Sequence, residues 1–285
     1  MGREKYWMAD PSELLRVGDG FRLDEIDMDD TPGFVGGKLE GRAALKQGEG
    51  ILTELQEMLY ASSIGGDDPR RVLLVLQALD TAGKGGIVRH VMGAVDPQGV
   101  KLTAFKAPTP EELEHDFLWR IRPAVPEGGV IGVFDRSHYA DVLIGRVREL
   151  APAEEIERRY GAINEFEAEL AASDTTIIKV MLHISAGEQK KRLQERLDRP
   201  EKHWKYNPAD IDERLLRSKY MEAFQVAIER TTTADAPWYV VPADHKWYAR
   251  LVVQHLLIAA LEDMDLDWPE ADFDVEAEKE RLAAS

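Results

Sequence analysis

Apolar residues along the chain fall into five short runs, which are separated by polar loops and by longer stretches with a helical pattern. The runs cover residues 71–79, 100–107, 129–135, 175–184 and 238–243. Four of them are rich in β-branched residues and do not alternate with polar residues, as is typical of strands buried on both faces of a parallel sheet. The helical stretches between them fit crossover connections. The pattern therefore predicts a doubly wound α/β fold around a parallel five-stranded sheet.

Two flanking regions lie outside this alternation. Residues 1–70 begin with an acidic, turn-rich segment and continue with apolar residues at helical spacing, so we expect an N-terminal helical extension. The last 24 residues, from Glu262, contain ten acidic and two basic residues. Residues 263–285 are therefore expected to form a solvated acidic C-terminal tail. An α/β domain over residues 71–262 is expected between the two.

The first apolar run ends in the loop LDTAGKGG, which leads into a helix-compatible stretch. A strand, a glycine-bearing turn and a helix start form a phosphate cradle, because backbone N–H groups and the helix dipole favour anions. The loop departs twice from the usual G-x-x-x-x-G-K-[ST] pattern: Ala78 replaces the first glycine, and Gly85 replaces the hydroxyl residue that would bind magnesium. We still favour a phosphate site over a simple turn with a solvated lysine. Its predicted phosphate-binding residues are Ala82, Gly83, Lys84, Gly85 and Gly86.

Polar residues directly after the strands matter because ligands of open α/β sheets bind beyond the carboxyl ends of the strands. Asp135 closes the third run, where an acid can hold a metal ion or cap a helix. Asp80 could supply the missing metal oxygen, position an attacking phosphate, or only shape the turn. We expect Asp80 and Asp135 to bind Mg²⁺, with Mn²⁺ as the alternative ion. Arg136 could clamp a transferring phosphoryl group or form a surface ion pair.

One segment is strongly basic. Between residues 190 and 205 the chain carries seven lysines and arginines and three acids. Arg192, Arg196 and Arg199 are three or four residues apart and could share one helical face, which Pro200 would end. We expect a helix and a loop that cover a bound anion; the alternative is a solvated helix face.

Composition narrows the classes of partner. The chain has 285 residues, 44% of them hydrophobic, and a net charge of −17. This charge argues against nonspecific binding to nucleic acids or anionic membranes, although a local basic surface could still bind an anionic ligand. The chain has no cysteine, which excludes disulfides and thiolate metal sites. It shows neither an apolar signal-peptide core nor a membrane-spanning stretch, so we expect a cytoplasmic protein.

Six ordered blocks resemble the polyphosphate kinase 2 family, most closely its class III branch. They are LDEIDMDDTPGF, LQALDTAGKGG, GVKLTAFKAPTPEELEHDFLWR, GVFDRSHYADVL, ISAGEQKKRLQERLDRPEKHWKYNPAD and APWYVVPADHKWYAR. The resemblance implies a three-layer α/β/α P-loop kinase-like fold with a helical lid over about residues 186–220. It also implies inorganic polyphosphate as the donor, AMP, ADP and ATP as nucleotide partners with guanine nucleotides as further candidates, and a homo-oligomer, either a dimer or a tetramer.

The resemblance also assigns roles to individual residues. Asp80 would be catalytic and lie near the metal ions, and Lys84 would bind phosphates. The other catalytic residues would be Asp135 and Arg136, which serve metal and phosphate. The remaining phosphate contacts would be Lys106, Arg192 and Arg196, the last two from the lid.

One position departs from the family pattern. Class III members usually carry an acidic residue directly after the SHY tripeptide and class I members an amide, whereas this chain has Ala140 followed by Asp141. The position is associated with the choice between mono- and diphosphate acceptors. If a helix begins at Asp135 and Arg136, Ala140 lies about one turn into it, beside the metal–phosphate site. We therefore expect a stronger preference for ADP over AMP than in relatives with an acid there.

The predicted activity is a reversible, Mg²⁺-dependent transfer of a phosphoryl group from polyphosphate to nucleoside mono- or diphosphates. Positioning and electrostatic stabilisation would carry this reaction without a covalent intermediate. Two alternatives stay open at this point. One is an ATP-dependent nucleoside monophosphate kinase, and the other is a P-loop protein that binds nucleotide without turnover.

Overall fold

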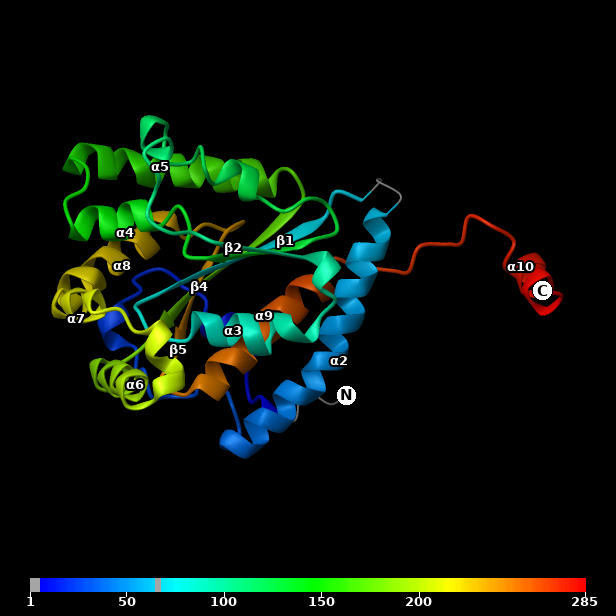
Figure 1. The fold of residues 1–285 in the computed structure, drawn as a ribbon, viewed down its shortest axis with the longest axis horizontal. Helices are drawn as coiled ribbons and strands as arrows, with labels where there is room; N and C mark the ends of the chain where they lie inside the picture. The colour runs from blue at the N-terminus through cyan, green and yellow to red at the C-terminus, as the bar shows by residue number, and fades with distance from the viewer. Residues whose placement is uncertain (1–5, 65–67) are drawn as a thin grey trace.

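A parallel five-stranded sheet lies at the centre of the molecule, with helices on both of its faces (Figure 1). The computed structural model describes residues 6–64 and 68–285; residues 1–5 and 65–67, which belong to the expected N-terminal extension, lie outside the described residues. The strand order is β2-β3-β1-β4-β5. The strands are β1 Arg71–Ala78, β2 Val100–Ala104, β3 Ile131–Asp135, β4 Thr175–His183 and β5 Trp238–Pro242. All five predicted strands are confirmed.

The helices divide between the two faces of the sheet (Figure 1). Helices α2, α3 and α9 cover one face, and α4, α5 and α8 cover the other. The helices are α1 Pro11–Leu14, α2 Lys38–Ser63, α3 Lys84–His90, α4 Ala140–Val147, α5 Ala153–Ala171, α6 Ala186–Asp198, α7 Ala209–Leu215, α8 Arg217–Thr231, α9 Lys246–Glu262 and α10 Val275–Ala283. The predicted three-layer α/β/α architecture is confirmed.

Strand β1 shows why its apolar run does not alternate with polar residues. Successive side chains of a strand point to opposite faces of the sheet. Val72, Leu74 and Leu76 pack on the α2, α3 and α9 side, whereas Leu73 and Val75 pack on the α4, α5 and α8 side. Both faces of this central strand are therefore buried.

Helix α2 packs closely along α9. Gly41 faces the ring of Trp247, and Gly48 faces the side chain of Gln254, so that a Cβ at either glycine would overlap its neighbour. The two glycines allow the helix axes to approach. Helix α2 thereby joins α3 and α9 in the layer of helices on one face of the sheet.

The last helix, α10, stands apart from the sheet at the end of an extended segment (Figure 1). All of its residues are exposed to solvent. No helix in the described part of the chain is long and apolar enough to cross a membrane.

Candidate active site

Residues 79–83 join β1 to α3 at the carboxyl edge of the sheet, and we call them the phosphate loop after their predicted role. Ala78, at the place of the usual first glycine, is the last residue of β1 and pairs with Leu182 of β4. Left-handed backbone angles occur instead at Thr81, with φ 67°, and at Gly83, with φ 132°. Gly85 lies in the first turn of α3, with open space where a Cβ would stand. Both departures from the motif are thus compatible with the shape of a phosphate loop.

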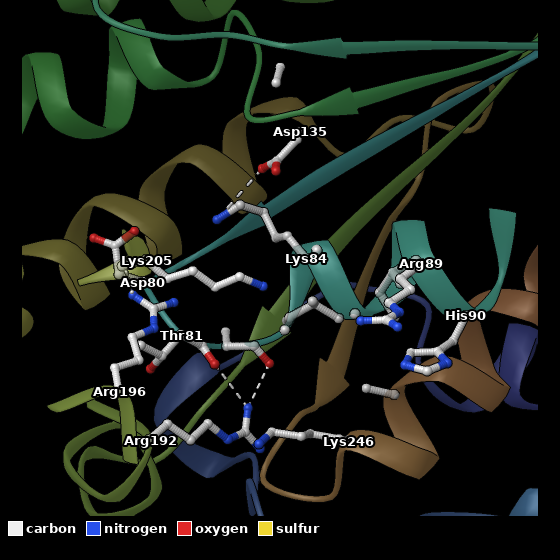
Figure 2. A pocket seen from close by; sticks show the side chains of 18 of the residues that line it. Asp80, Thr81, Lys84, Arg89, His90, Asp135, Arg192, Arg196, Lys205 and Lys246 are labelled. Carbon is white, nitrogen blue, oxygen red and sulfur yellow. Dashed lines mark hydrogen bonds and ion pairs between the residues drawn. The ribbon is translucent and has the colours of Figure 1, made fainter. Parts of the chain in front are cut away.

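Lys84 begins α3 and extends its ammonium group toward β3 (Figure 2). Its Nζ donates to the carbonyl oxygen of Ala78 at 3.3 Å and lies 3.9 Å from Oδ1 of Asp135. Burial lowers the pKa of Lys84, and the charge of Asp135 opposes that shift. An ammonium group has three N–H donors, and only one of them has a hydrogen-bond partner among the described residues. The other donors can bind phosphate oxygens.

Asp80 and Arg136 form a second charged pair at the same edge. Nη2 of Arg136 donates to Oδ1 of Asp80 at 3.0 Å, and the arginine side chain is half-exposed. Arg136 follows β3 directly and has a left-handed backbone with φ 64°. The helix expected to begin at Asp135 and Arg136 begins only at Ala140, so that prediction is wrong.

The turn before α4 explains this late start. Oγ of Ser137, a buried side chain, accepts a hydrogen bond from Nε2 of Gln77 at 2.9 Å and another from the Tyr139 backbone at 3.2 Å. Tyr139 is also fully buried. The three residues that follow Arg136 are all buried, whereas Arg136 itself is half-exposed and lies in the strained left-handed region. Ala140 is consequently the first residue of α4, and it is not among the described residues that line the cavity.

These charged side chains meet in one cavity of about 770 Å³ (Figure 2). The cavity extends from the end of β2 across the phosphate loop to α9. The predicted site residues on its lining are Asp80, Ala82, Gly83, Lys84, Gly85, Gly86, Lys106, Asp135, Arg136, Arg192 and Arg196. The structure therefore brings together every predicted site residue except Ala140.

Further basic residues on this lining were not among the predicted site residues, although two of them, Lys202 and Lys205, belong to the basic segment 190–205 that was expected to cover an anion. They are Arg89, His90, Lys202, Lys205, Lys246 and Arg250. Lys246 and Arg250 are the two lysine or arginine residues of α9, four positions apart in a largely buried helix. Two cations on one side of an otherwise apolar helix are a signal that could have identified them.

Two carboxylates, Asp80 and Asp135, could hold a divalent metal ion. No group of three or more histidine, cysteine, aspartate or glutamate side chains with metal-binding geometry occurs among the described residues. Magnesium sites that act on phosphates commonly combine one or two carboxylates with substrate phosphates and water. Two hard oxygen ligands beside a phosphate loop fit an ion of that kind.

Arg192 of α6 was predicted to bind phosphate, but its donors are used within the protein. Its side chain is buried, and its two Nη atoms donate to four backbone carbonyl oxygens at 2.7–3.1 Å. Figure 2 shows the two of these hydrogen bonds that reach the phosphate loop. These carbonyls belong to Thr81, Ala82, Ala243 and Asp244. Its Nε donates to Glu188 at 2.8 Å, so all five guanidinium N–H groups are used. In this geometry Arg192 joins α6 to the phosphate loop instead of offering donors to phosphate.

The other arginines of the basic segment are partly paired. Nη1 of Arg196 lies 3.1 Å from Oδ2 of Asp210, and the side chain still borders the cavity. Arg199 lies beyond the end of α6 and pairs with Glu201. The expectation that the three arginines share one helical face is therefore wrong for Arg199. The 3₁₀ turn Pro200–Lys205 that follows agrees with the predicted break at the proline.

A buried polar network lies on the α4, α5 and α8 side of the sheet and was not predicted. Nζ of Lys179 donates to Oε2 of Glu167 at 2.5 Å, to the backbone oxygen of Thr231 at 2.6 Å and to the Tyr139 hydroxyl at 3.0 Å. The Tyr139 hydroxyl donates to Oε1 of Glu167 at 2.7 Å. Burial favours a neutral Glu167, but Lys179 and the neighbouring His138 hold the pKa of this carboxyl below its ordinary value.

Comparison with known proteins agrees with this geometry. A sequence model of the family described as Polyphosphate kinase 2 matches residues 37–269. An AMP/ADP-polyphosphate phosphotransferase of Meiothermus ruber is 46% identical over 250 residues, which cover 88% of this chain and 92% of the relative. An ADP-polyphosphate phosphotransferase of Rhodopseudomonas palustris is 39% identical over 275 residues, which cover 91% of this chain and 92% of the relative.

A solved structure gives the same result for the fold. The crystal structure of a polyphosphate kinase 2 from Arthrobacter aurescens TC1 is 58% identical in sequence and superposes with a TM-score of 0.95 over 98% of both chains. The phosphate loop and its cavity thus belong to a fold that is already known in that enzyme. On these grounds the chain belongs to the polyphosphate kinase 2 family.

Proposed function

We propose that this protein transfers a phosphoryl group from inorganic polyphosphate to AMP or ADP, in a reversible exchange of one phosphoanhydride for another. The observation that carries the proposal is the meeting of Lys84, Asp135 and Arg136 at a basic cavity beside the phosphate loop. The names of the relatives from Meiothermus ruber and Rhodopseudomonas palustris support this choice of donor and acceptors.

The cavity side chains would act by position and charge. Lys84 and Arg136 would bind the oxygens of the transferred group, on which negative charge is spread in the transition state. Lys106 at the end of β2 and Arg196 from the lid would orient the flanking phosphates. Such positioning turns the encounter of two anions into an oriented in-line transfer, and no covalent intermediate is needed.

Asp80 and Asp135 would hold the divalent metal ion that phosphoryl transfer of this kind generally requires, and we propose Mg²⁺. When bound, the ion neutralises part of the phosphate charge. Asp80 has a further effect in the structure, because its ion pair keeps the Arg136 guanidinium at the mouth of the cavity.

We further infer that residues 186–220 act as a lid over this cavity. The segment contains α6, the turn Pro200–Lys205 and α7, and it would belong to an α/β domain of residues 71–262 flanked by the N-terminal helical extension and the C-terminal tail. Guanine nucleotides as secondary acceptors, and assembly as a homo-oligomer, are proposals from family membership.

The test is an assay with polyphosphate as the only donor. Purified protein is incubated with Mg²⁺, polyphosphate and either AMP or ADP, and the nucleotides are separated by chromatography. We expect ADP from AMP and ATP from ADP. Turnover with ATP plus AMP, but none with polyphosphate, would instead identify an ATP-dependent nucleoside monophosphate kinase. Nucleotide binding without turnover from either donor would identify a non-catalytic P-loop protein.

A further inference from the structure

The two segments that carry Asp80 and Arg136 are joined by a side-chain hydrogen bond outside the cavity. Nε2 of Gln77, in β1, donates to Oγ of Ser137, in the turn after β3, at 2.9 Å. Both side chains are buried, and neither belongs to the described residues that line the cavity. In this arrangement the pair can act on a substrate only through its neighbours.

Gln77 is a polar residue at the end of an otherwise apolar strand segment. Its side chain shares the face of the sheet used by Leu73 and Val75, because residues two apart in a strand point the same way. That face is covered by apolar residues of α4, α5 and α8. An apolar side chain would fill this place without the cost of burying an amide. What the glutamine adds is a directed bond to Ser137.

This bond fixes the residue next to Arg136. Oγ of Ser137 also accepts from the Tyr139 backbone at 3.2 Å, and the backbone N–H of Arg136 donates to the carbonyl oxygen of Leu76 at 3.1 Å. Arg136 is thus held to β1 by its own backbone and, one residue later, by Ser137. Its φ of 64° lies in the left-handed region, which a residue other than glycine keeps only where its surroundings impose it.

The ion pair with Asp80 is a weaker restraint on Arg136. The arginine side chain is half-exposed, and water and salt screen an ion pair of that kind. A phosphoryl group bound to the guanidinium would also compete with Asp80 for its N–H donors. The bond between Gln77 and Ser137 is buried away from the cavity, so neither solvent nor a ligand weakens it.

We propose that Gln77 is a positioning residue for phosphoryl transfer. Through Ser137 it holds the Arg136 backbone in the left-handed conformation, so that the guanidinium borders the cavity before a substrate arrives. Donors that are already in place stabilise a transition state without a cost of reorganisation at the moment of reaction. The inference rests on the proposed function and adds to it a residue that touches no substrate.

The test removes the donor of this bond. Gln77→Met is the test variant, because methionine is unbranched and flexible and cannot donate to Ser137. Gln254→Met is the matched control: Gln254 is also buried, its Nε2 donates to the backbone oxygen of Leu45 at 3.0 Å, and it does not line the cavity. Gln77→Met is also introduced into Arg136→Ala, which is assayed at high enzyme concentration. Steady-state kinetics with polyphosphate and ADP, thermal unfolding, and a crystal structure of Gln77→Met are the measurements.

We expect Gln77→Met to lower kcat about tenfold, equivalent to about 1.4 kcal/mol of barrier. The KM values for polyphosphate and ADP should change by less than about twofold, because the interaction that is lost belongs to the transition state. The control should lose a similar amount of thermal stability and keep kcat within about twofold of the parent's. In the Arg136→Ala background, Gln77→Met should change kcat by less than about twofold, since Gln77 acts through Arg136. The crystal structure should show Arg136 outside the left-handed region.

Four outcomes would overturn the positioning role. They are a parent-like kcat of Gln77→Met, a loss that persists in full in the Arg136→Ala background, an equal loss of kcat in Gln254→Met, and a crystal structure of Gln77→Met in which Arg136 keeps its left-handed backbone. Parent protein that shows no transfer from polyphosphate would overturn the proposed function alone, because the crystal structure still decides whether Gln77 holds Arg136.

Discussion

Two lysine–carboxylate pairs of this protein differ in how completely their hydrogen bonds are satisfied. Nζ of Lys179 lies 2.5 Å from Glu167 and donates to two further oxygens at 2.6 and 3.0 Å, in a site with no solvent exposure. Nζ of Lys84 lies 3.9 Å from Asp135 and donates to one carbonyl oxygen, at the wall of an open cavity. The first pair has no donor left for a ligand, whereas the second has two.

The arginines show the same contrast. Arg192 uses all five N–H groups within the protein, and it holds the phosphate loop against the loop after β5. The side chain of Arg136 makes one hydrogen bond within the described part of the chain, to Asp80, and remains half-exposed. Saturation by protein acceptors thus separates residues that build the site from residues that are available to a phosphate. The predictions below test that separation.

The largest effect is expected when the buried Lys179–Glu167 ion pair is broken. Lys179→Met should lower the free energy of unfolding by about 3–5 kcal/mol, because it leaves the Glu167 carboxylate buried without its partner. Urea unfolding measures the loss. The double variant Lys179→Met with Glu167→Leu should recover much of it, since no buried charge remains. Equal instability of the single and double variants would contradict this interpretation.

The buried Lys179–Glu167 pair should also make the free energy of unfolding depend on pH in the acid range. Lys179 and His138 hold the pKa of Glu167 below its ordinary value despite burial. The contribution of the pair is therefore present at neutral pH and lost as the pH falls through the pKa of this carboxyl in the folded protein. The double variant without the pair should lack that part of the acid dependence in unfolding experiments at stepped pH.

Asp80→Asn should reduce turnover by at least about tenfold, or about 1.4 kcal/mol of barrier. The change removes a proposed metal ligand and weakens the ion pair that holds Arg136. Steady-state rates over a range of Mg²⁺ concentrations check this, with Asp19→Asn as a control at an exposed position away from the cavity. A variant that matches the parent at every Mg²⁺ concentration would exclude a role for Asp80.

Arg192→Lys and Arg196→Lys should differ although both keep the charge. Lysine at 192 cannot satisfy four carbonyls and a carboxylate, so we expect turnover to fall about tenfold as the phosphate loop loses its support. Lysine at 196 still presents a cation to the cavity, and the KM for polyphosphate should change by less than about threefold. The reverse ranking in steady-state kinetics would show that Arg192 binds phosphate directly.

Ala140→Glu is expected to have the smallest effect. Ala140 begins α4 and is not on the described lining, so only a longer side chain could approach the acceptor. We expect kcat/KM for AMP relative to ADP to rise by at most about threefold. An unchanged ratio of kcat/KM for AMP to kcat/KM for ADP, measured with polyphosphate in excess, would show that this position has no role in the choice of acceptor.

Features that depend on local sequence could be predicted, and features that depend on distant acceptors could not. The strands and the loop around Lys84 follow from unalternating apolar runs and a glycine-bearing turn. The role of Arg192 depends on carbonyls at 81–82 and 243–244, which only the folded chain brings together. The start of α4 likewise depends on the burial of Ser137 and Tyr139 below the sheet edge.

The central claim is that the Lys84–Asp135 pair, which has unused N–H donors, performs the chemistry. The Lys179–Glu167 pair, which has no unused donor, maintains the fold. The most direct test of this claim is the turnover of AMP or ADP with polyphosphate, per folded molecule and at low temperature, for Lys84→Ala beside Lys179→Met. We predict that Lys84→Ala retains the parent's thermal unfolding midpoint within a few degrees but loses about 100-fold or more in kcat. The folded fraction of Lys179→Met should keep a rate within about threefold of the parent's. Parent-like turnover by Lys84→Ala would contradict the account.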